Sequence, residues 1–312
     1  MRIERCTLCP RRCGALREAD SGSGRCRMGA DPVVARAALH FWEEPCISGT
    51  KGSGAVFFTG CPLGCVFCQN YGISAERKAG KRVSPSELAA VFERLESQGA
   101  QNINLVTPTH FVPAVLEALS IHRPSVPVVY NCGGYETPET LRMLKGFVDI
   151  FLPDFKYMDA GLASALSGAP DYPEVAKAAI LEMVRQTGPA VFGADGMMKS
   201  GTMVRHLILP GHTGDSIAVL EWLAADFPSG VPISLMAQYV PCGRAADFPG
   251  MGRRITRREY EKVQNRLFAL GLDGYVQERS SASKDYIPAF DFSGVLPRPG
   301  PAIRLGEKGK PI

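Results

Sequence analysis

Three cysteines crowd a short stretch of this sequence. Cys61, Cys65 and Cys68 have the spacing C-x3-C-x2-C and directly follow an apolar run, residues 55–58, that predicts a β-strand. Thiolates at this density select zinc, copper(I) or an iron–sulfur cluster. A structural zinc site takes four ligands, and a 4Fe–4S cluster held by protein alone takes four cysteines. Three cysteines therefore indicate a 4Fe–4S cluster with one iron open to a small molecule.

The same stretch, residues 59–70, resembles the signature of the radical S-adenosylmethionine (SAM) superfamily, in which an aromatic residue, Phe67 in this chain, precedes the last cysteine. The resemblance implies that the amino and carboxylate groups of SAM chelate the open iron. It also implies that the reduced cluster cleaves SAM to methionine and a 5′-deoxyadenosyl radical. The alternative is a zinc knuckle that borrows a fourth ligand from elsewhere. The spacing, the preceding strand and Phe67 favour the radical SAM interpretation.

A second cysteine group opens the chain, on a loop too polar and too rich in glycine to bury a core. A bound metal would supply the missing folding energy. Tetrahedral zinc is one account and an auxiliary iron–sulfur cluster is the other; the sequence leaves both open. The four residues are Cys6, Cys9, Cys13 and Cys26.

Composition narrows the class of protein. The 312 residues are 45% hydrophobic with a net charge of +4, which gives no case for nucleic acid or an anionic membrane as partner. No run of eighteen apolar residues predicts a membrane span. The first residues lack the apolar core of a secretory signal, so we expect reduced thiols and a cytoplasmic location. The isolated cysteines are interpreted as small buried hydrophobic residues: Cys46, Cys132 and Cys242.

Strand and helix signals alternate from Gly54 onward, which predicts an α/β fold with a parallel sheet. Six or so βα units are fewer than the eight of a closed barrel. We therefore expect a partial (β/α)6 TIM-like barrel, open on one side, as the radical SAM resemblance also implies. The expected organisation is a Cys-rich N-terminal metal-binding extension (1–50), the barrel (51–290) and a Pro/Gly-rich tail (291–312). Strands are expected at residues 55–58, 102–106, 127–131, 148–152, 202–209, 231–237 and 274–277.

Polar residues at the predicted strand ends are candidates for binding SAM or substrate, because function gathers where barrel strands end. Asp154-x-Lys156 and Arg205…Pro210-Gly211 resemble segments of glycyl-radical-enzyme activases that line their SAM and substrate pocket. Two activase features are missing, a Gly-Gly-Glu turn after strand two and a histidine after strand six. The candidates are Thr107, Thr109 and His110 after strand two, Asn131 after strand three, Asp154 and Lys156 after strand four, Arg205 in strand five, and Gln238 after strand six.

The resemblance covers about residues 1–290 and is closest to a subgroup similar to pyruvate formate-lyase activating enzymes, which shares the Glu43-Glu44-Pro45 segment. It implies hydrogen abstraction from a protein such as a glycyl radical enzyme, with ferredoxin or flavodoxin as electron donor. Radical modification of another protein or of a small metabolite is the alternative. A non-catalytic electron carrier is disfavoured, because its cluster would be fully ligated by protein.

Overall fold

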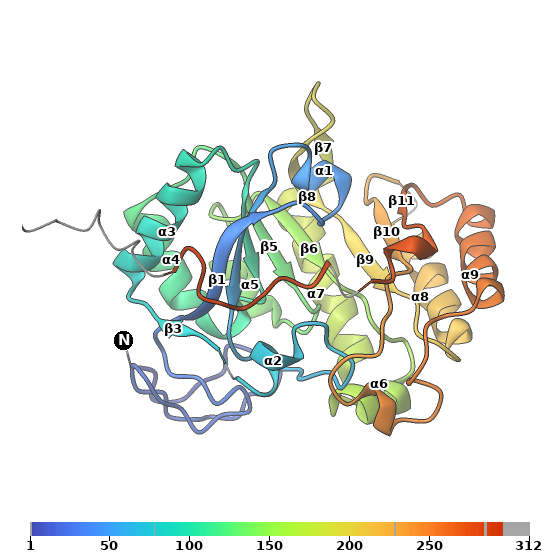
Figure 1. Cartoon of the computed structure of the whole chain (residues 1–312), viewed down its shortest axis with the longest axis horizontal. Coiled ribbons are helices and arrows are strands. Elements are labelled where there is room, and N and C mark those ends of the chain that lie inside the picture. The colour runs from blue at the N-terminus through green and yellow to red at the C-terminus, as the bar shows by residue number, and fades with distance from the viewer. Residues whose placement is uncertain (1, 78, 228, 284–285, 296–312) are drawn as a thin grey trace, which may run out of the picture.

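The protein is represented by a computed structural model, which describes residues 2–77, 79–227, 229–283 and 286–295. Strands form a curved wall at its centre, and most helices lie outside that wall (Figure 1). The strands of the described residues are β1 (Val33–His40), β2 (Ser53–Phe58), β3 (Lys81–Arg82), β4 (Ile103–Val106), β5 (Val128–Cys132), β6 (Ile150–Pro153), β7 (Val191–Phe192), β8 (Met198–Thr202), β9 (Val204–Leu207), β10 (Ile233–Met236) and β11 (Gly274–Val276). The α-helices are α1 (Pro45–Ser48), α2 (Tyr71–Ser74), α3 (Pro85–Ser97), α4 (Val112–Ile121), α5 (Pro138–Met143), α6 (Ala160–Ser167), α7 (Tyr172–Thr187), α8 (Thr213–Asp226) and α9 (Arg257–Ala269). Three 3-10 turns complete the elements: η1 (Thr109–Phe111), η2 (Ala245–Asp247) and η3 (Arg279–Ser281).

Parallel pairing dominates the wall. Strands β2, β4, β5 and β6 pair in parallel, and so do β9, β10 and β11. A parallel bridge between Asp154 and Arg205 connects the two sheets. The parallel strands thus follow one another from β2 to β11, and the expected partial α/β barrel is confirmed.

Local sequence signals explain most of these elements. Every residue of β2, β4, β5, β6 and β10 is buried, so these strands are mostly apolar along their whole length and do not alternate with polar residues. Capping boxes begin α3 at Ser84 and α9 at Thr256. In each box a side-chain oxygen accepts from the backbone N–H of a glutamate three residues on, and the glutamate carboxylate accepts from the cap residue.

Three features differ from the sequence prediction. The expected strand 202–209 is two strands, β8 and β9, interrupted at Met203, and β8 also pairs with β7. Strand β1 is not predicted; it runs antiparallel to β2 and lies in the region where the sequence suggests only a cysteine-rich extension. Cys46 and Cys132 are buried as expected, but Cys242 is only half-buried.

Residues 286–295, which we call the C-terminal strap, run along β1 (Figure 1). The Phe292 N–H donates to the Ala35 carbonyl at 3.1 Å, and the Ala37 N–H donates to the Ser293 carbonyl at 2.9 Å. No pairing in the described part of the chain joins β11 to β1 or β3, so the barrel is not closed there. The remainder of the expected tail, residues 296–312, lies outside the described residues.

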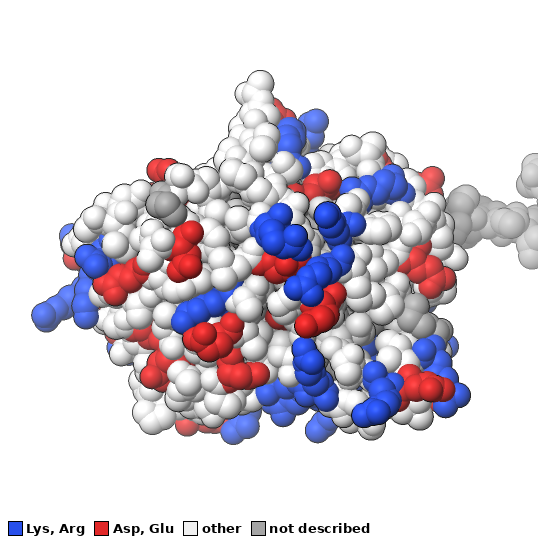
Figure 2. Space-filling model, turned by 180° about the vertical axis from the view of Figure 1, so that it is seen from behind, with Lys and Arg blue, Asp and Glu red and all other residues white. Residues whose placement is uncertain are grey.

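The molecular surface is mixed in charge where it is seen from behind, with acidic and basic side chains next to one another (Figure 2). Within the described ranges, no helix has the length and apolarity needed to cross a membrane.

Candidate active site

The loop with three cysteines follows β2 at the carboxyl end of the parallel strands. Gly60 precedes it with a φ of +85°, and a Cβ there would lie 2.5 Å from Cγ of Met28, so only glycine fits. The thiols of Cys61, Cys65 and Cys68 line one cavity of about 200 Å³. Burial, reinforced by the neighbouring thiols, raises the pKa of Cys61 to about 12 and that of Cys68 to about 11.

These three thiols fit an iron–sulfur cluster rather than a single metal ion. The three thiols line one cavity, which suits a cluster that offers each cysteine its own iron. Because thiolates are the ligands, iron binding would displace protons that burial otherwise holds on the sulfur atoms.

A buried ionic network borders the thiols. Both carboxylate oxygens of Asp154 are paired: Lys156 Nζ lies 2.5 Å from Oδ2, and Arg205 Nε lies 2.8 Å from Oδ1. Burial alone would raise the pKa of Asp154, but these two cations hold it below its ordinary value. Burial alone would lower the pKa of Lys156, but the negative charge of Asp154 and, to a smaller extent, that of the Cys65 thiolate raise it above its ordinary value.

Arg205 is held by the protein's own groups. Its Nη2 donates to Asn131 Oδ1 at 2.6 Å, and its Nη1 donates to Glu43 Oε2 at 3.1 Å. Glu44 Oε2 lies 3.9 Å from the same Nη1. The activase resemblance implies a guanidinium presented to SAM or substrate. In this structure the guanidinium instead organises the cavity wall.

Six of the eight candidates from the strand ends line the cavity with the cysteines. One of them, Thr107, has a φ of +56°, a costly conformation for a β-branched residue that clusters at functional sites. Its N–H donates to the Asn131 carbonyl at 2.7 Å. The six are Thr107, Asn131, Asp154, Lys156, Arg205 and Gln238.

Thr109 and His110 are not among the described residues that line this cavity. The η1 turn places both in the interior, where Thr109 Oγ1 donates to Glu136 Oε1 at 2.7 Å. His110 Nε2 lies 2.9 Å from the Thr59 carbonyl oxygen. Burial lowers the pKa of His110 to about 3, so this imidazole is neutral at physiological pH.

The sequence analysis did not select four features of the site. Glu43, Trp42 and Cys132 line the cavity, as does Tyr286 of the strap, whose ring centroid lies 4.8 Å from that of Trp42. Only Glu43 had a usable signal, two adjacent carboxylates at the end of an apolar run. Glu136 lies behind the cavity, where burial raises its pKa to about 7.

The second cysteine loop packs against the first. Arg77 Nε donates to the Cys26 carbonyl at 2.9 Å, and Arg11 Nε donates to the Pro62 carbonyl at 3.0 Å. Arg17 is fully buried, with Nη1 3.5 Å from Cys6 Sγ. Burial raises the pKa of Cys26, and the charges of Cys6 and Cys13 add to it. In the described residues, the four thiols are not arranged as a group that holds a metal ion. Cys6, Cys9 and Cys26 are buried and Cys13 is exposed.

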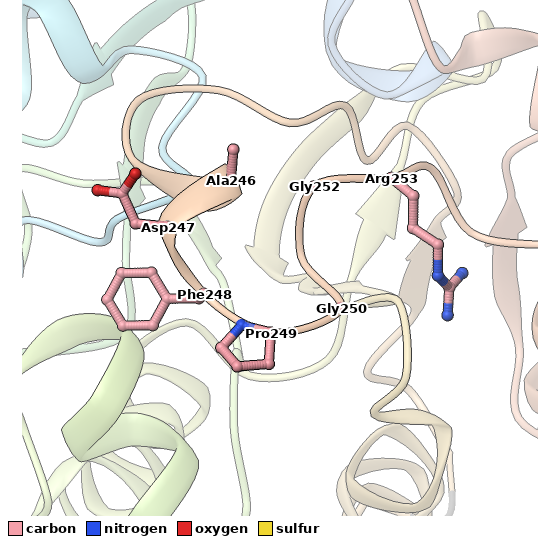
Figure 3. A pocket seen from close by; sticks show the side chains of 7 residues that line it. All are labelled: Ala246, Asp247, Phe248, Pro249, Gly250, Gly252 and Arg253. Atoms are coloured by element: carbon pink, nitrogen blue, oxygen red, sulfur yellow. The ribbon is translucent and has the colours of Figure 1, made fainter.

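A wider hollow of about 530 Å³ lies on the loop between β10 and α9 (Figure 3). Its charged lining residues are Asp247 and Arg253, and Arg253 is already paired with Glu259 at 2.7 Å. It contains no thiol and no unpaired catalytic group in the described residues, so the cysteine cavity is the stronger candidate. The lining is Ala246, Asp247, Phe248, Pro249, Gly250, Gly252 and Arg253.

Comparison with known proteins agrees with this site. The model of the radical SAM superfamily matches residues 55–223. The chain therefore belongs to the radical SAM superfamily of enzymes, which use a 4Fe–4S cluster and SAM. An uncharacterised protein of Methanocaldococcus jannaschii is 28% identical over 271 residues, which cover 84% of this chain and 73% of that protein.

The solved structures that resemble this chain have low sequence identity to it. SuiB of Streptococcus suis bound to SAM is 12% identical, with a TM-score of 0.49 over 70% of this chain and 48% of that chain. A radical SAM methyltransferase from Sphaerobacter thermophilus is 14% identical, with a TM-score of 0.49 over 72% of this chain and 66% of that one. The chain spans about half the length of SuiB, and the family assignment rests on the family model.

Proposed function

We propose that this protein reductively cleaves SAM and removes a hydrogen atom from a protein substrate, as the glycyl-radical-enzyme activases that it resembles do. The observation that carries the proposal is the shared cavity, in which three thiols meet a buried network of Asp154, Lys156 and Arg205. Both lie at the carboxyl ends of the parallel strands, where barrel enzymes place their chemistry.

Each part of the cavity has a role in this proposal. Cys61, Cys65 and Cys68 would hold the cluster, and cluster and SAM together supply a strongly reducing one-electron cleavage. Asp154 fixes the side chains of Lys156 and Arg205 in the cavity wall. Apolar lining residues, Leu63 and Phe67 among them, are buried and exclude water from the reacting atoms.

The unclosed side of the barrel supports a protein substrate. The strap is fastened to β1 by backbone hydrogen bonds and by the ion pair of Arg36 with Asp291, whose side chain is 54% exposed. Exposed pairs contribute about 1 kcal/mol or less. The strap also has apolar anchors, since Phe290 packs on Phe57 with ring centroids 5.6 Å apart and Val295 is buried. An extended peptide that supplies apolar side chains of its own would replace the strap by adding a strand to the edge of β1.

A small metabolite is the second candidate substrate. It is favoured if the strap stays in place, because strap residues then narrow the cavity. Tyr286, Ile287 and Pro288 line the cavity, so the space remaining with the strap in place is about 200 Å³. That space suits a small molecule better than a protein segment. The two candidates therefore differ in whether the strap stays or leaves.

Two further roles are part of the proposal. A ferredoxin or flavodoxin would supply the electron, since SAM cleavage needs a strongly reducing donor. The N-terminal cysteines would bind a separate metal, zinc or a cluster, that serves folding, because their loop has only isolated bridges at Arg17 as regular structure.

The test is anaerobic reconstitution with iron and sulfide, followed by SAM and dithionite, with and without candidate partners. We expect 5′-deoxyadenosine, and we expect it to carry deuterium when a glycyl radical enzyme is supplied with deuterated glycine. Label that appears only with a deuterated metabolite would replace the protein substrate with the second candidate. No 5′-deoxyadenosine from a preparation with a full cluster would overturn the proposal.

A further inference from the structure

The charges around the cavity do not balance. Five charged side chains from different parts of the chain form one network, and each is between 3% and 17% exposed. Three are acids and two are bases, so the network carries one net negative charge when all are ionised. The acids are Glu43, Glu44 and Asp154, and the bases are Lys156 and Arg205.

Nearby histidines do not supply the missing positive charge. Burial lowers the pKa of His206 to about 4, and its Nδ1 lies 2.7 Å from the Phe155 carbonyl oxygen. His40 lines the cavity, and burial lowers its pKa as well. Both are neutral at pH 7. A buried carboxylate without a counter-charge is expensive, so the network needs either a proton or a cation from outside.

Glu43 is the acid that an incoming cation can reach. Both oxygens of Asp154 are paired, and Glu44 is not among the described residues that line the cavity. Glu43 lines it, and its oxygens accept one hydrogen bond each in the network, from Asn131 Nδ2 at 3.3 Å and from Arg205 Nη1 at 3.1 Å. A carboxylate oxygen has two lone pairs, so Glu43 can accept further donors.

We propose that Glu43 binds a positively charged primary amine of the molecule that occupies the cavity. This inference rests on the proposed function, since it takes the cysteine cavity as the reaction site. The binding energy comes from balancing the fifth charge of the network and from charge-assisted hydrogen bonds to the carboxylate.

The geometry selects an ammonium group over a guanidinium. A guanidinium binds best when both oxygens of one carboxylate are free for two parallel bonds, and each Glu43 oxygen already has a donor. An ammonium group is compact and has three donors that it can direct separately. The amine is therefore one of the substrate, because the amino group of SAM would be deprotonated when it chelates the open iron, as the radical SAM family implies.

The experiment compares two probes of the same length, n-pentylammonium and n-pentanol, on the reconstituted enzyme by ligand-observed NMR without a reductant. Glu43→Gln removes the cavity-facing charge. Glu44→Gln is the matched control, because it removes one charge from the same network behind the cavity wall. SAM affinity of each protein is measured separately by equilibrium dialysis.

We expect the wild type to bind pentylammonium about tenfold more tightly than pentanol. Glu43→Gln should lose this preference altogether, because it removes both the surplus charge and the carboxylate that faces the cavity. Glu44→Gln balances the network but leaves the Glu43 carboxylate as an acceptor, so it should lose only part of the preference. If the amine preference is weak but Glu43→Gln weakens SAM binding about tenfold, while Glu44→Gln does not, Glu43 serves the binding of SAM and the proposal of a substrate amine is overturned. Equal binding of both probes together with unchanged SAM affinity in Glu43→Gln would overturn the proposal and indicate that a glutamate holds a proton.

The wild-type comparison needs no variant, and thermal unfolding of Glu43→Gln shows whether that protein is folded. If Glu43→Gln does not fold, Glu43→Asp is used in its place. Its carboxylate keeps the charge but lies one methylene further from the cavity, so the preference for pentylammonium over pentanol should fall. These measurements involve no turnover. Their failure is therefore distinct from a failure to form 5′-deoxyadenosine, which would count against the proposed function itself.

Discussion

The two cysteine loops of this protein differ in what lies in front of their sulfur atoms. Cys61, Cys65 and Cys68 follow a buried strand and line a cavity that also contains a charged network. The four N-terminal cysteines are absent from the described lining of that cavity, and a buried arginine, Arg17, ties their loop together. Three thiols with space beside them suit reaction, whereas a set of four thiols, three of them buried, suits a structural metal.

The sharpest test of this contrast removes one cysteine from the cavity loop. Replacing Cys61, Cys65 or Cys68 by Ala should abolish 5′-deoxyadenosine formation under anaerobic reducing conditions, because the cluster loses one of its three protein ligands. Cys46→Ala is the control, a buried cysteine outside the described cavity lining, and it should retain activity. Activity that survives in any of the three variants would contradict the assignment of the cluster to this loop.

The second test asks whether the N-terminal cysteines bind a metal of their own, independently of the cavity cysteines. A protein with all three cavity cysteines replaced should still contain zinc or iron, held by the N-terminal set. Replacing Cys6 and Cys9 by Ser should remove that metal and lower the free energy of unfolding by several kcal/mol, since a structural metal is a large part of local folding energy. Elemental analysis and thermal unfolding measure both. If the triple variant contained no metal, or if the Ser variants had unchanged stability, the N-terminal cysteines would not hold a separate structural metal.

Sequence patterns among neighbouring residues predicted the cysteine loop and the strands of the site. Contacts between residues far apart in the sequence were not predicted. The cysteine spacing and the buried strands each depend on residues close in sequence. Arg205 was selected from a local motif, but its partner Glu43 is 162 residues away, and no local pattern shows that they meet. The turn after β4 shows the same limit, because the 3-10 geometry at Thr109 decides which side chains face the cavity.

Glu136 connects the two regions, because its charge raises the pKa of both Cys9 and Cys132. Burial raises the pKa of Glu136 itself to about 7, against an ordinary value of 4.5. Because the pKa of Glu136 is higher in the folded state than in the unfolded state, its contribution to the free energy of unfolding is fully present below pH 4.5. That contribution is lost as the pH rises from 4.5 through 7. The loss amounts to about 3 kcal/mol.

Glu136→Gln should therefore remove this part of the pH dependence. The free energy of unfolding of the wild type should fall by up to about 3 kcal/mol more than that of the variant between pH 5 and pH 8. Urea unfolding at the two pH values measures the difference. Glu139→Gln, an exposed carboxylate three residues away, is the control and should follow the wild type. Parallel curves for Glu136→Gln and the wild type would show that its burial does not govern this titration.

The smallest expected effect concerns the contact between the two loops and uses adjacent arginines. Arg11 donates to the carbonyls of Pro62 at 3.0 Å and Ser167 at 2.9 Å, and its guanidinium lies 5.1 Å from the centroid of the Tyr135 ring. Arg12 pairs with Glu139 at 3.4 Å, where its side chain is 62% exposed.

Replacing each arginine by Met keeps most of the apolar stem and removes the charge. Arg11→Met should lower the free energy of unfolding by about 1–2 kcal/mol, because three carbonyls, those of Pro62, Ser167 and Gly168, lose a charged donor. Arg12→Met should change it by about 0.5 kcal/mol or less, as exposed ion pairs usually do. Thermal unfolding of the metal-loaded proteins measures both values. Equal values would mean that the N-terminal loop is stable without its contact to the cavity loop, and the two cysteine sets would then be independent units rather than one packed pair.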